Sequence, residues 1–255
     1  MEESRKPVIQ VKDLYKIYRV GDSKVRALNG VDFTIYKGEF CSIVGTSGSG
    51  KSTLLNMLAG LEKPTKGEII IAGEHMETKT ENQLVKFRRE HIGFIFQSFN
   101  LMGTMTALEN VALPLTFQGV SKEARMKKAN TLLDMVGLKK YKHHKPTQMS
   151  GGQQQRVGVA RALVVNPEII FADEPTGNLD SNTSEEVMRL MQKVVREKQQ
   201  TLVMVTHDNH LAGFADRIFH IIDGKIVQIE DNREKCSADS HAAESDEVGQ
   251  NEQNE

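Results

Sequence analysis

Hydrophobic residues along the chain fall into short apolar runs, separated by segments with helical spacing. Continuous apolar runs predict buried strands over 40–44, 92–96, 168–172 and 202–206. Alternating positions predict strands over 8–11, 31–35 and 68–73, and a terminal hairpin of 218–223 and 225–229 around Asp223 and Gly224. Strands that alternate with helical segments favour an α/β fold with a parallel-centred sheet.

The region from residue 98 to about 165 differs from the rest, because it contains helical patterns and no strand-like run. Ser121 can cap the start of one predicted helix, and Gly137 can end it. The apolar residues between them recur at helical spacing, namely Ala129, Leu132, Leu133 and Val136. We therefore predict a helical subdomain inserted into the α/β core. It lacks the sustained heptads of a coiled coil.

Charge divides the 255 residues into two parts. Residues 231–255 carry eight acids against Arg233 and Lys235, a net charge of −6, which leaves +5 on residues 1–230. The first part is long enough for one large domain, and the second has the polar composition of a disordered tail. A regulatory role for the tail is the alternative to a merely solvated one. A charge of +5 is too mild to indicate a nucleic-acid partner.

The remaining composition bears on the compartment. Cys41 and Cys236 form neither a disulfide framework nor a metal-ligand cluster. The N-terminus lacks the apolar core of a signal peptide, and no apolar run approaches the roughly 18 residues of a membrane span. We expect a cytoplasmic protein whose membrane role, if it has one, comes through a partner.

A glycine-rich loop carries the most specific chemistry. Residues 45–52 read Gly-Thr-Ser-Gly-Ser-Gly-Lys-Ser, between the predicted strand 40–44 and a helix over 51–59 that ends at Gly60. This order places the backbone N–H groups of a P-loop around nucleotide phosphates. Lys51 should reach the β- and γ-phosphates, and the Ser52 hydroxyl should bind Mg²⁺. A Gly/Ser-rich linker is the alternative, and the flanking elements argue against it. The predicted nucleotide-binding residues here are Gly45, Thr46, Ser47, Gly48, Ser49, Gly50, Lys51, Ser52 and Thr53.

Polar residues follow three other predicted strands. Asp173 and Glu174 end the run 168–172, so Asp173 is a candidate Mg²⁺ ligand and Glu174 a candidate base that activates water. Without the P-loop, a strand-end pair that starts a turn would be equally acceptable. His207 follows the strand 202–206 and can donate to the γ-phosphate, and Gln97 follows 92–96 and can touch Mg²⁺ or water. For Gln97 the alternative is a polar strand terminus.

A second anion-type surface lies about a hundred residues after the first. Ser150 can cap a helix over 152–165, and the two following glycines leave its first N–H groups uncovered. Two phosphate surfaces for one triphosphate make sense if two copies face each other across a twofold axis. A glycine-softened helix start is the alternative. The predicted residues of this surface are Ser150, Gly151, Gly152 and Gln153.

Two further residues complete the predicted nucleotide site. Asp180 follows the Asp-Glu pair closely in sequence and is a candidate for the same twofold interface. Tyr18 lies near a turn at Gly21 and Asp22, where an aromatic ring can stack on a nucleobase. Core packing is a serious alternative for Tyr18.

Taken in order, these motifs resemble the ATP-binding subunits of ABC transporters over about residues 8–230. The resemblance implies a P-loop NTPase fold with a RecA-like core, an antiparallel β subdomain and an inserted helical subdomain. It also implies ATP and Mg²⁺, a separate membrane permease, and a nucleotide-sandwich homodimer in which Ser150 and Gly152 contact ATP on the other subunit. Met149 stands where the family usually has Leu, a swap that costs little.

The finer pattern is similar to the lipoprotein-release, macrolide-export and cell-division branch. It is carried by residues 94–101 (Phe-Ile-Phe-Gln-Ser-Phe-Asn-Leu), 106–111 and 173–181. That branch implies a partner with few transmembrane helices, which exports a substrate or transmits motion across the membrane. We expect its cytoplasmic helix to dock near 97–101, on an apolar strip of Phe96, Phe99 and Leu101. Peptide-antibiotic resistance transporters share much of the pattern and stay an alternative.

Proteins of other classes fit less well. A DNA-repair ATPase of this superfamily needs a long coiled coil between 51 and 150, and a translation-associated relative needs two ATPase halves. A small-molecule P-loop kinase does not need the Ser-Gly-Gly-Gln-Gln string at 150–154.

Overall fold

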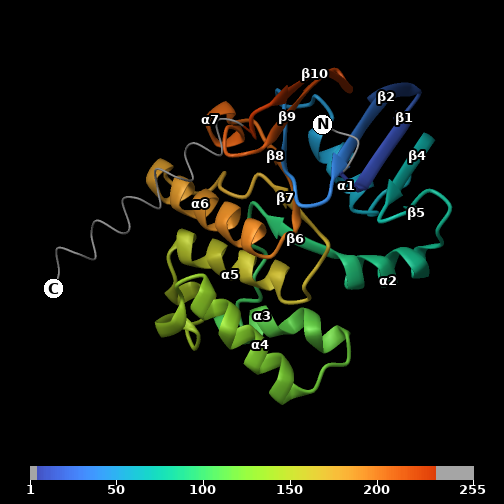
Figure 1. Ribbon diagram of the computed structural model, residues 1–255. Coiled ribbons are helices and arrows are strands. Elements are labelled where there is room, and N and C mark those ends of the chain that lie inside the picture. Colours follow the sequence, from blue (N-terminus) through green and yellow to red (C-terminus); the bar gives the residue numbers. More distant parts are fainter. Residues whose placement is uncertain (1–4, 234–255) are drawn as a thin grey trace.

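Two sheets form the framework of the protein, whose computed structural model describes residues 5–233 (Figure 1). The larger sheet has the strand order β10-β9-β3-β8-β7-β6. Its five strands from β9 to β6 run parallel to their neighbours, and β10 is antiparallel to β9. This order confirms the predicted parallel-centred sheet. The strands are β3 (Phe40–Val44), β6 (Ile92–Phe96), β7 (Ile169–Asp173), β8 (Thr201–Thr206), β9 (Arg217–Ile222) and β10 (Lys225–Asp231).

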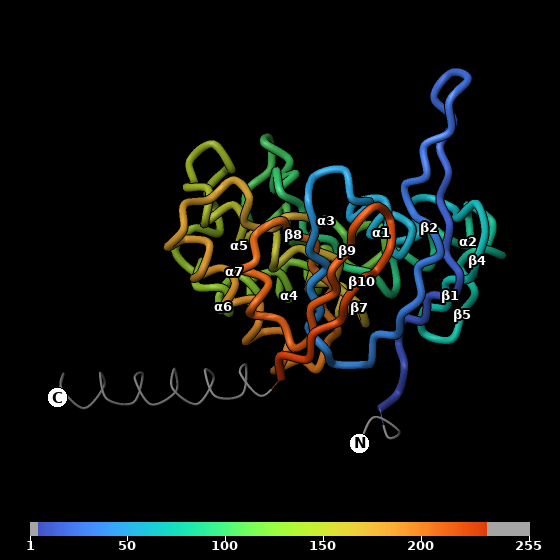
Figure 2. Tube along the Cα trace, turned by 90° about the horizontal axis from the view of Figure 1, so that it is seen from above, coloured from blue at the N-terminus to red at the C-terminus, as the bar shows by residue number. Residues whose placement is uncertain are grey.

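The smaller sheet is antiparallel, with the order β2-β1-β4-β5. Its strands are β1 (Pro7–Val20), β2 (Ser23–Tyr36), β4 (Lys66–Ile71) and β5 (Glu74–His75). The alternation predicts only residues 8–11 of β1, whereas β1 continues to Val20 because it pairs with β2 as a long hairpin. Register shifts between Val11 and Ile17 interrupt the alternation. Figure 2 shows the end of this hairpin projecting from the rest of the chain.

Helices account for the region without strands. Between residues 98 and 165, the elements are α3 (Ala107–Phe117), α4 (Lys122–Met135), α5 (Gly151–Leu163) and the short 3₁₀ turns Lys139–Tyr141 and Pro146–Gln148. The Ser121 hydroxyl caps α4 by accepting from the Ala124 N–H, and Gly137 follows the helix with a φ of +75°. These contacts confirm the predicted start and end of α4.

The other helices lie on or beside the larger sheet. They are α1 (Lys51–Leu58), α2 (Glu81–His91), α6 (Ser181–Glu197) and α7 (Asn209–Ala212). The sequence reasoning predicts α1 but neither α2 nor α6. Only Leu84 and Phe87 of α2 are buried, so its apolar periodicity is weak, although Thr80 and Gln83 form a capping box at its start.

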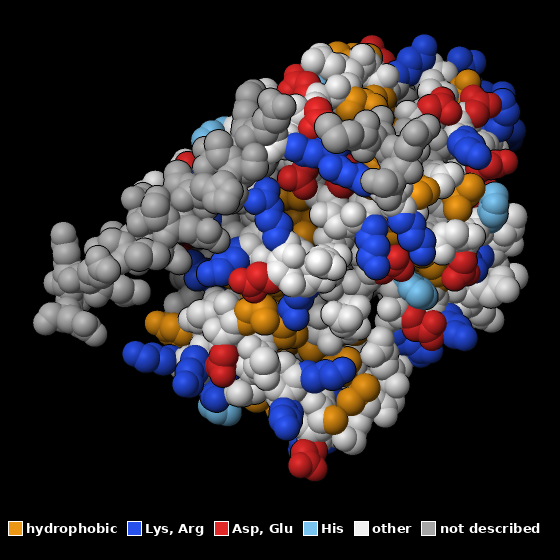
Figure 3. All heavy atoms as spheres, in the orientation of Figure 1, with side chains coloured by type: hydrophobic (Ala, Val, Ile, Leu, Met, Phe, Trp, Pro, Cys, Tyr) orange, Lys and Arg blue, Asp and Glu red, His pale blue; other side chains and the backbone are white. Residues whose placement is uncertain are grey.

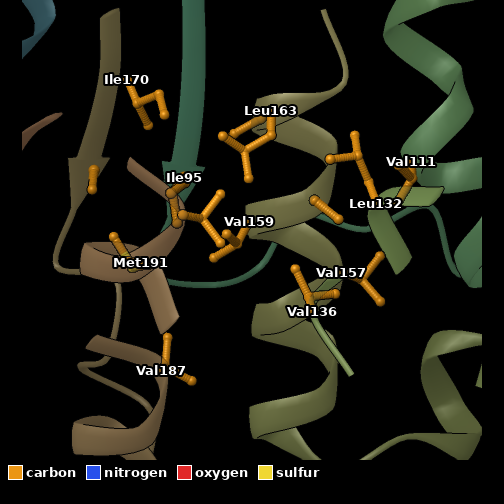
Figure 4. Packing of buried hydrophobic residues seen from close by; sticks show 14 of the residues in the cluster. Ile95, Val111, Leu132, Val136, Val157, Val159, Leu163, Ile170, Val187 and Met191 are labelled. Carbon is orange, nitrogen blue, oxygen red and sulfur yellow. The ribbon is translucent and has the colours of Figure 1, made fainter. Parts of the chain in front are cut away.

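The strand β7 separates two hydrophobic clusters, because its alternate residues face opposite sides of the sheet. Ile169 and Phe171 join the cluster shared with the smaller sheet and α1. Ile170 and Ala172 join the cluster formed by α3 to α6. Figure 4 shows Ile170 and Ile95 on the sheet side of that cluster, opposite Val159 of α5. Burial on both faces explains why β7 is a continuous apolar run.

The surface carries both charge signs. In Figure 3, Lys and Arg side chains are interspersed with Asp and Glu over the visible face. No helix within residues 5–233 combines the length and the apolar content needed to cross a bilayer. The strand β10 extends through Asp231, one residue into the predicted tail, and the tail from 234 onward lies outside the described residues.

Candidate active site at the carboxyl edge of the large sheet

Four neighbouring parallel strands end at one edge, and each is followed by predicted site residues. Val44 pairs with Thr206, Asp173 pairs with Val205, and Phe96 pairs with Asp173. The P-loop, His207, the Asp173–Glu174 pair and Gln97 therefore leave the sheet from the same edge. Ligands of open α/β sheets bind outside the carboxyl ends of the strands. Adjacent strands thus bring together residues up to 160 positions apart in the sequence.

The P-loop needs glycine at three positions. Gly48 and Gly50 have φ values of +80° and +103°, a region that L side chains rarely adopt. A Cβ on Gly45 would lie 2.3 Å from the Ile221 carbonyl oxygen, and one on Gly50 would lie 2.4 Å from the Ala27 carbonyl oxygen. Gly50 also precedes α1, and no side chain of the described part of the chain caps this N-terminus. The first N–H groups of α1 are thereby left to an anion.

Lys51 lies across this loop. Its Nζ donates to the carbonyl oxygens of Gly45 and Thr46, both at 2.8 Å. Burial lowers the pKa of Lys51, while the carboxylates of Glu174 and Asp173 act in the opposite direction. The Ser49 hydroxyl, within the loop, is buried and has no hydrogen-bond partner among residues 5–233. An ammonium, an unpartnered hydroxyl and uncapped N–H groups are donors that fit a polyphosphate.

Asp173 and Ser52 supply oxygen ligands next to the ammonium. Burial and the neighbouring Glu174 carboxylate raise the pKa of Asp173, whereas Lys51 and a hydrogen bond from Ser52 lower it. A divalent cation would relieve the crowding of the two carboxylates. Among residues 5–233, no group of three His, Cys, Asp or Glu side chains could hold a metal by itself. The donor set fits Mg²⁺, which is usually held by one or two carboxylates together with substrate phosphates.

Glu174 has an unusual backbone and a histidine partner. Its φ is +42°, in the left-handed region, and its N–H donates to the Val205 carbonyl oxygen at 2.9 Å. Its Oε1 lies 3.0 Å from Nδ1 of His207. Non-glycine residues in such conformations cluster at active sites, where surrounding contacts hold them in place. The carboxylate next to the phosphate loop and the exposed His207 are thus placed as a pair.

Gln97 is exposed and is fixed through the turn that follows Glu174. The Asn178 amide donates to the Gln97 carbonyl oxygen at 3.0 Å. The side chain of Gln97 lies over Gly177, where a Cβ would come within 2.8 Å of its Nε2. Gln97 is therefore in direct contact with Gly177 and Asn178, in the segment between β7 and α6.

Residues 150–153, which we call the signature segment, open α5. The Ser150 hydroxyl accepts from the Gln153 N–H, and the Gln153 side chain accepts from the Ser150 N–H at 3.0 Å, a capping box. A Cβ on Gly152 would lie 2.5 Å from the Thr183 methyl carbon. Within residues 5–233, no hydrogen bond or ion pair joins this segment to residues 45–53. The predicted helix start is confirmed.

Asp180 and Tyr18 have local partners. Asp180 caps α6 by accepting from the Thr183 N–H at 3.0 Å, and hydrogen bonds from Thr183 lower its pKa. The Tyr18 hydroxyl donates to Glu62 at 2.6 Å, and Lys16 Nζ lies 5.1 Å from its ring centre. Burial and the hydrogen bond to Glu62 raise the pKa of Tyr18. Sequence reasoning missed Glu62, which belongs to no motif.

A groove lies between α2, β6, α3 and α5, with a volume of about 530 Å³. It includes Phe96 of the predicted docking strip, but Phe99 and Leu101 lie elsewhere. Phe99 faces Gly151, and Leu101 packs against the helical cluster. The three residues of the predicted strip therefore do not all line this groove, and docking near 97–101 stays a prediction. The aromatic and basic residues that line the groove are Phe94, Phe96, Phe117, Arg88, Arg89 and Arg161.

Comparison with known proteins assigns a family. The family model described as "ABC transporter" matches residues 28–177. An uncharacterised ABC transporter ATP-binding protein of Thermotoga maritima is 48% identical over 88% of the chain and 96% of its own length. The macrolide export ATP-binding/permease protein MacB of Hyphomonas neptunium is 45% identical over 92% of the chain, which spans only 36% of that protein.

Solved structures agree with this assignment. The ATP-binding cassette MJ0796, solved as a dimer in a post-hydrolysis state with ADP and Pi, is 47% identical and has a TM-score of 0.81. The match covers 88% of this chain and 99% of that one. A second dimeric structure of MJ0796 is 48% identical with the same TM-score. A protein of that name comes from Methanocaldococcus jannaschii.

Proposed function

The chain belongs to the ABC transporter family as an ATP-binding, ATP-hydrolysing cassette, and from this premise we propose that two copies close on two MgATP and drive a separate membrane permease. The observation that carries the proposal is the single sheet edge at which the P-loop, Asp173–Glu174, Gln97 and His207 follow neighbouring strands. A solved relative, MJ0796, is a dimer with ADP and Pi.

In this proposal, ATP binds through the P-loop. Its β- and γ-phosphates accept from the N–H groups of α1 and from Lys51, which exchanges its two carbonyl partners for phosphate oxygens. Ser52 and Asp173 would hold Mg²⁺, because both contribute oxygen atoms next to the loop. When bound, this ion neutralises phosphate charge. Tyr18 stacks on the base with Thr53 nearby.

Glu174 is the residue that activates water. A carboxylate takes a proton only from a water within hydrogen-bond reach, and the left-handed backbone of Glu174 together with His207 fixes where its oxygens lie. His207 donates to the γ-phosphate, and Gln97 would contact the Mg²⁺ or the attacking water. Attack on the γ-phosphorus then breaks its bond to the β–γ bridging oxygen, which leaves ADP and phosphate.

The signature segment acts on the nucleotide of the other copy. Within the described residues of one chain, no hydrogen bond or ion pair joins it to the P-loop, and in this proposal a second copy brings Ser150, Gly151, Gly152 and Gln153 to the nucleotide. Two such contacts related by a twofold axis form an isologous interface. Asp180, beside this segment through α6, lies at the same interface.

The experiment that tests the hydrolytic role is Glu174→Gln. Removal of a general base lowers turnover by about 10²–10⁴-fold, whereas ATP binding through the P-loop is retained. We expect phosphate release to be lost and ATP-bound dimer to accumulate, measured by steady-state kinetics and sedimentation. Near-normal hydrolysis would rule out Glu174 as the base.

The groove is the proposed docking site for the permease. Phe94, Phe96 and Phe117 offer an apolar floor for a short amphipathic helix, and Arg88 and Arg89 offer a basic rim. Docking there places the cassette on the inner, cytoplasmic face of the cell membrane. The MacB relatives carry the ATP-binding and permease functions in one chain, as their name "ATP-binding/permease protein" says. This supports a partner of the macrolide-export or lipoprotein-release type.

A pull-down tests the permease and its docking site. Tagged Glu174→Gln protein with ATP should capture, from native membranes, a protein with few transmembrane helices and a large outer domain. Phe117→Ser should reduce the capture, because Phe117 is 66% exposed in the groove wall. Val227→Ser is a matched control, since Val227 is 56% exposed on β10, outside the groove. Capture of a larger helical bundle would indicate a conventional solute transporter instead.

The alternative is a peptide-antibiotic resistance or cell-division complex that carries no solute. The residues 94–101, 106–111 and 173–181 are compatible with it. The captured permease distinguishes the two, because reconstitution of that complex either moves a substrate or leaves hydrolysis uncoupled from transport.

A further inference from the structure

Arg161 of α5 is a partly buried cation in the wall of the groove. Its Nη2 donates to the Phe99 carbonyl oxygen at 2.8 Å, and its Nη1 donates to the Asn100 carbonyl oxygen. Its guanidinium carbon lies 5.9 Å from the centre of the Phe96 ring. It forms no ion pair with any carboxylate of the described ranges, and burial lowers the pKa of Arg161. Removing part of a charged group from water is costly unless it is hydrogen-bonded, and these two carbonyl oxygens supply that compensation.

The two carbonyls belong to a turn that the chain would not adopt readily by itself. Phe99 and Asn100 have φ values of +59° and +48°. Asn tolerates the left-handed region, but a bulky residue such as Phe is rarely found there. The planar guanidinium donates to both residues at once, through two nitrogens in a fixed geometry. Arg161 therefore stabilises two consecutive left-handed residues.

This turn connects two sites that are otherwise apart. Phe96, before it, lines the groove. Within the turn, the Phe99 ring faces the signature segment, since a Cβ on Gly151 would lie 3.7 Å from Phe99 Cζ. Leu179 packs on the same glycine, where that Cβ would lie 3.0 Å from its Cδ2. The segment 97–100 thus lies between the groove and the signature segment, and Arg161 contacts Phe96 before it and Phe99 and Asn100 within it.

We propose that Arg161 is a positioning residue, which holds the Phe99–Asn100 turn against Gly151 and so sets the signature segment for the nucleotide of the second copy. An occupant of the groove would reach the signature segment through the same side chain. The inference rests on the proposed function, because it assumes closure of two copies on ATP. Arg161 itself does not touch the nucleotide, so its loss should impair closure while leaving ATP binding to a single copy intact.

The test uses the full chain carrying Glu174→Gln, without the permease, so that failure of the docking proposal does not affect it. We expect Arg161→Gln to raise the ATP concentration needed for dimer formation by about tenfold, which is within the range of coupling changes caused by single residues. Nucleotide affinity of the dilute monomer should change by less than about twofold. Arg161→Lys should shift closure in the same direction, because a single ammonium lacks the two-nitrogen fork.

Two further variants separate positioning from simple stability. Asn100→Gly in the Arg161→Gln protein should restore much of the closure, because glycine adopts the left-handed turn without help. Arg156→Gln is the matched control, since Arg156 lies on the same helix and pairs with Glu186 at the surface. Arg161→Lys with normal closure, absence of rescue by Asn100→Gly, or an equal shift in Arg156→Gln would overturn the proposal. Failure of the Glu174→Gln parent to dimerise would instead refute the sandwich itself.

Discussion

The P-loop and the signature segment both lie at a helix N-terminus, yet they offer an anion different donors. No described side chain caps α1, whose start is surrounded by Lys51, Ser52 and Asp173. In contrast, the start of α5 is already capped by Ser150, and its glycines pack against apolar side chains of the same chain. A helix N-terminus alone thus attracts an anion, whereas a catalytic site also needs the side chains that follow the neighbouring strands. In the proposed dimer, the signature segment is half a site.

The largest expected effect is that of Lys51→Ala, which removes the only side-chain cation that the described P-loop contributes. Removal of one donor that stabilises transferring phosphoryl charge costs about 10²–10³-fold in rate. Because Lys51 also binds the ground-state phosphates, we expect loss of hydrolysis and of nucleotide affinity together. Phosphate release and equilibrium binding of a fluorescent ATP analogue measure the two. Retained affinity with lost turnover would mean that Lys51 acts only in the transition state.

The next effect sharpens the contrast, because it separates binding from closure. Ser150→Arg places a long cation at the exposed edge of α5, where the second copy must approach. We expect ATP affinity of the monomer to stay within about twofold, while dimer formation in the Glu174→Gln background weakens by at least about tenfold. Sedimentation at increasing ATP measures this. Equal losses of affinity and closure would place Ser150 at its own chain's nucleotide and remove the argument for a twofold sandwich.

A smaller effect concerns packing behind the two glycine-rich segments. Gly152→Ala brings a Cβ to 2.5 Å from the Thr183 methyl carbon, so we expect a loss of about 1–3 kcal/mol in unfolding free energy. Thr183→Ser removes that methyl group and should recover most of the loss. For Gly45→Ala the obstacle is the Ile221 carbonyl oxygen, which no side-chain replacement removes. Urea unfolding of Gly152→Ala, of Thr183→Ser and of the double variant measures the coupling between the two positions. Strictly additive changes in unfolding free energy would contradict this account.

The parts of the fold that depend on a single local signal are predictable from the sequence. The P-loop, the strand β3 and the start of α5 follow from glycine spacing, apolar runs and a capping residue, each a local signal. By contrast, α2 buries only Leu84 and Phe87, so its periodicity does not stand out. The length of β1 depends on its pairing with β2, which no local pattern in residues 12–20 reveals.

The candidate site divides in the same way. Glu174 and His207 are predictable as strand-end residues, but their contact depends on the neighbouring register of β7 and β8. Arg161 has no signal in the sequence, because its role depends on two left-handed residues some sixty positions earlier. The place of the Phe99 ring next to Gly151 has no sequence signal either, because it depends on the same left-handed turn.

The smallest expected effect concerns Asp180, which caps α6 through Thr183, the residue that lies against Gly152. Hydrogen bonds from Thr183 lower the pKa of Asp180, so the carboxylate form stabilises the fold. A depressed pKa contributes stability that is present above the unfolded value, about 3.9, and is lost as the pH falls through the folded value. Asp180→Asn keeps a capping side chain without the charge. Wild type should therefore be slightly more stable than Asp180→Asn at neutral pH, and the difference should vanish under acid conditions. Denaturant unfolding of both proteins from about pH 7 to about pH 2 measures this difference. A difference that does not change with pH would show that the cap acts through geometry alone.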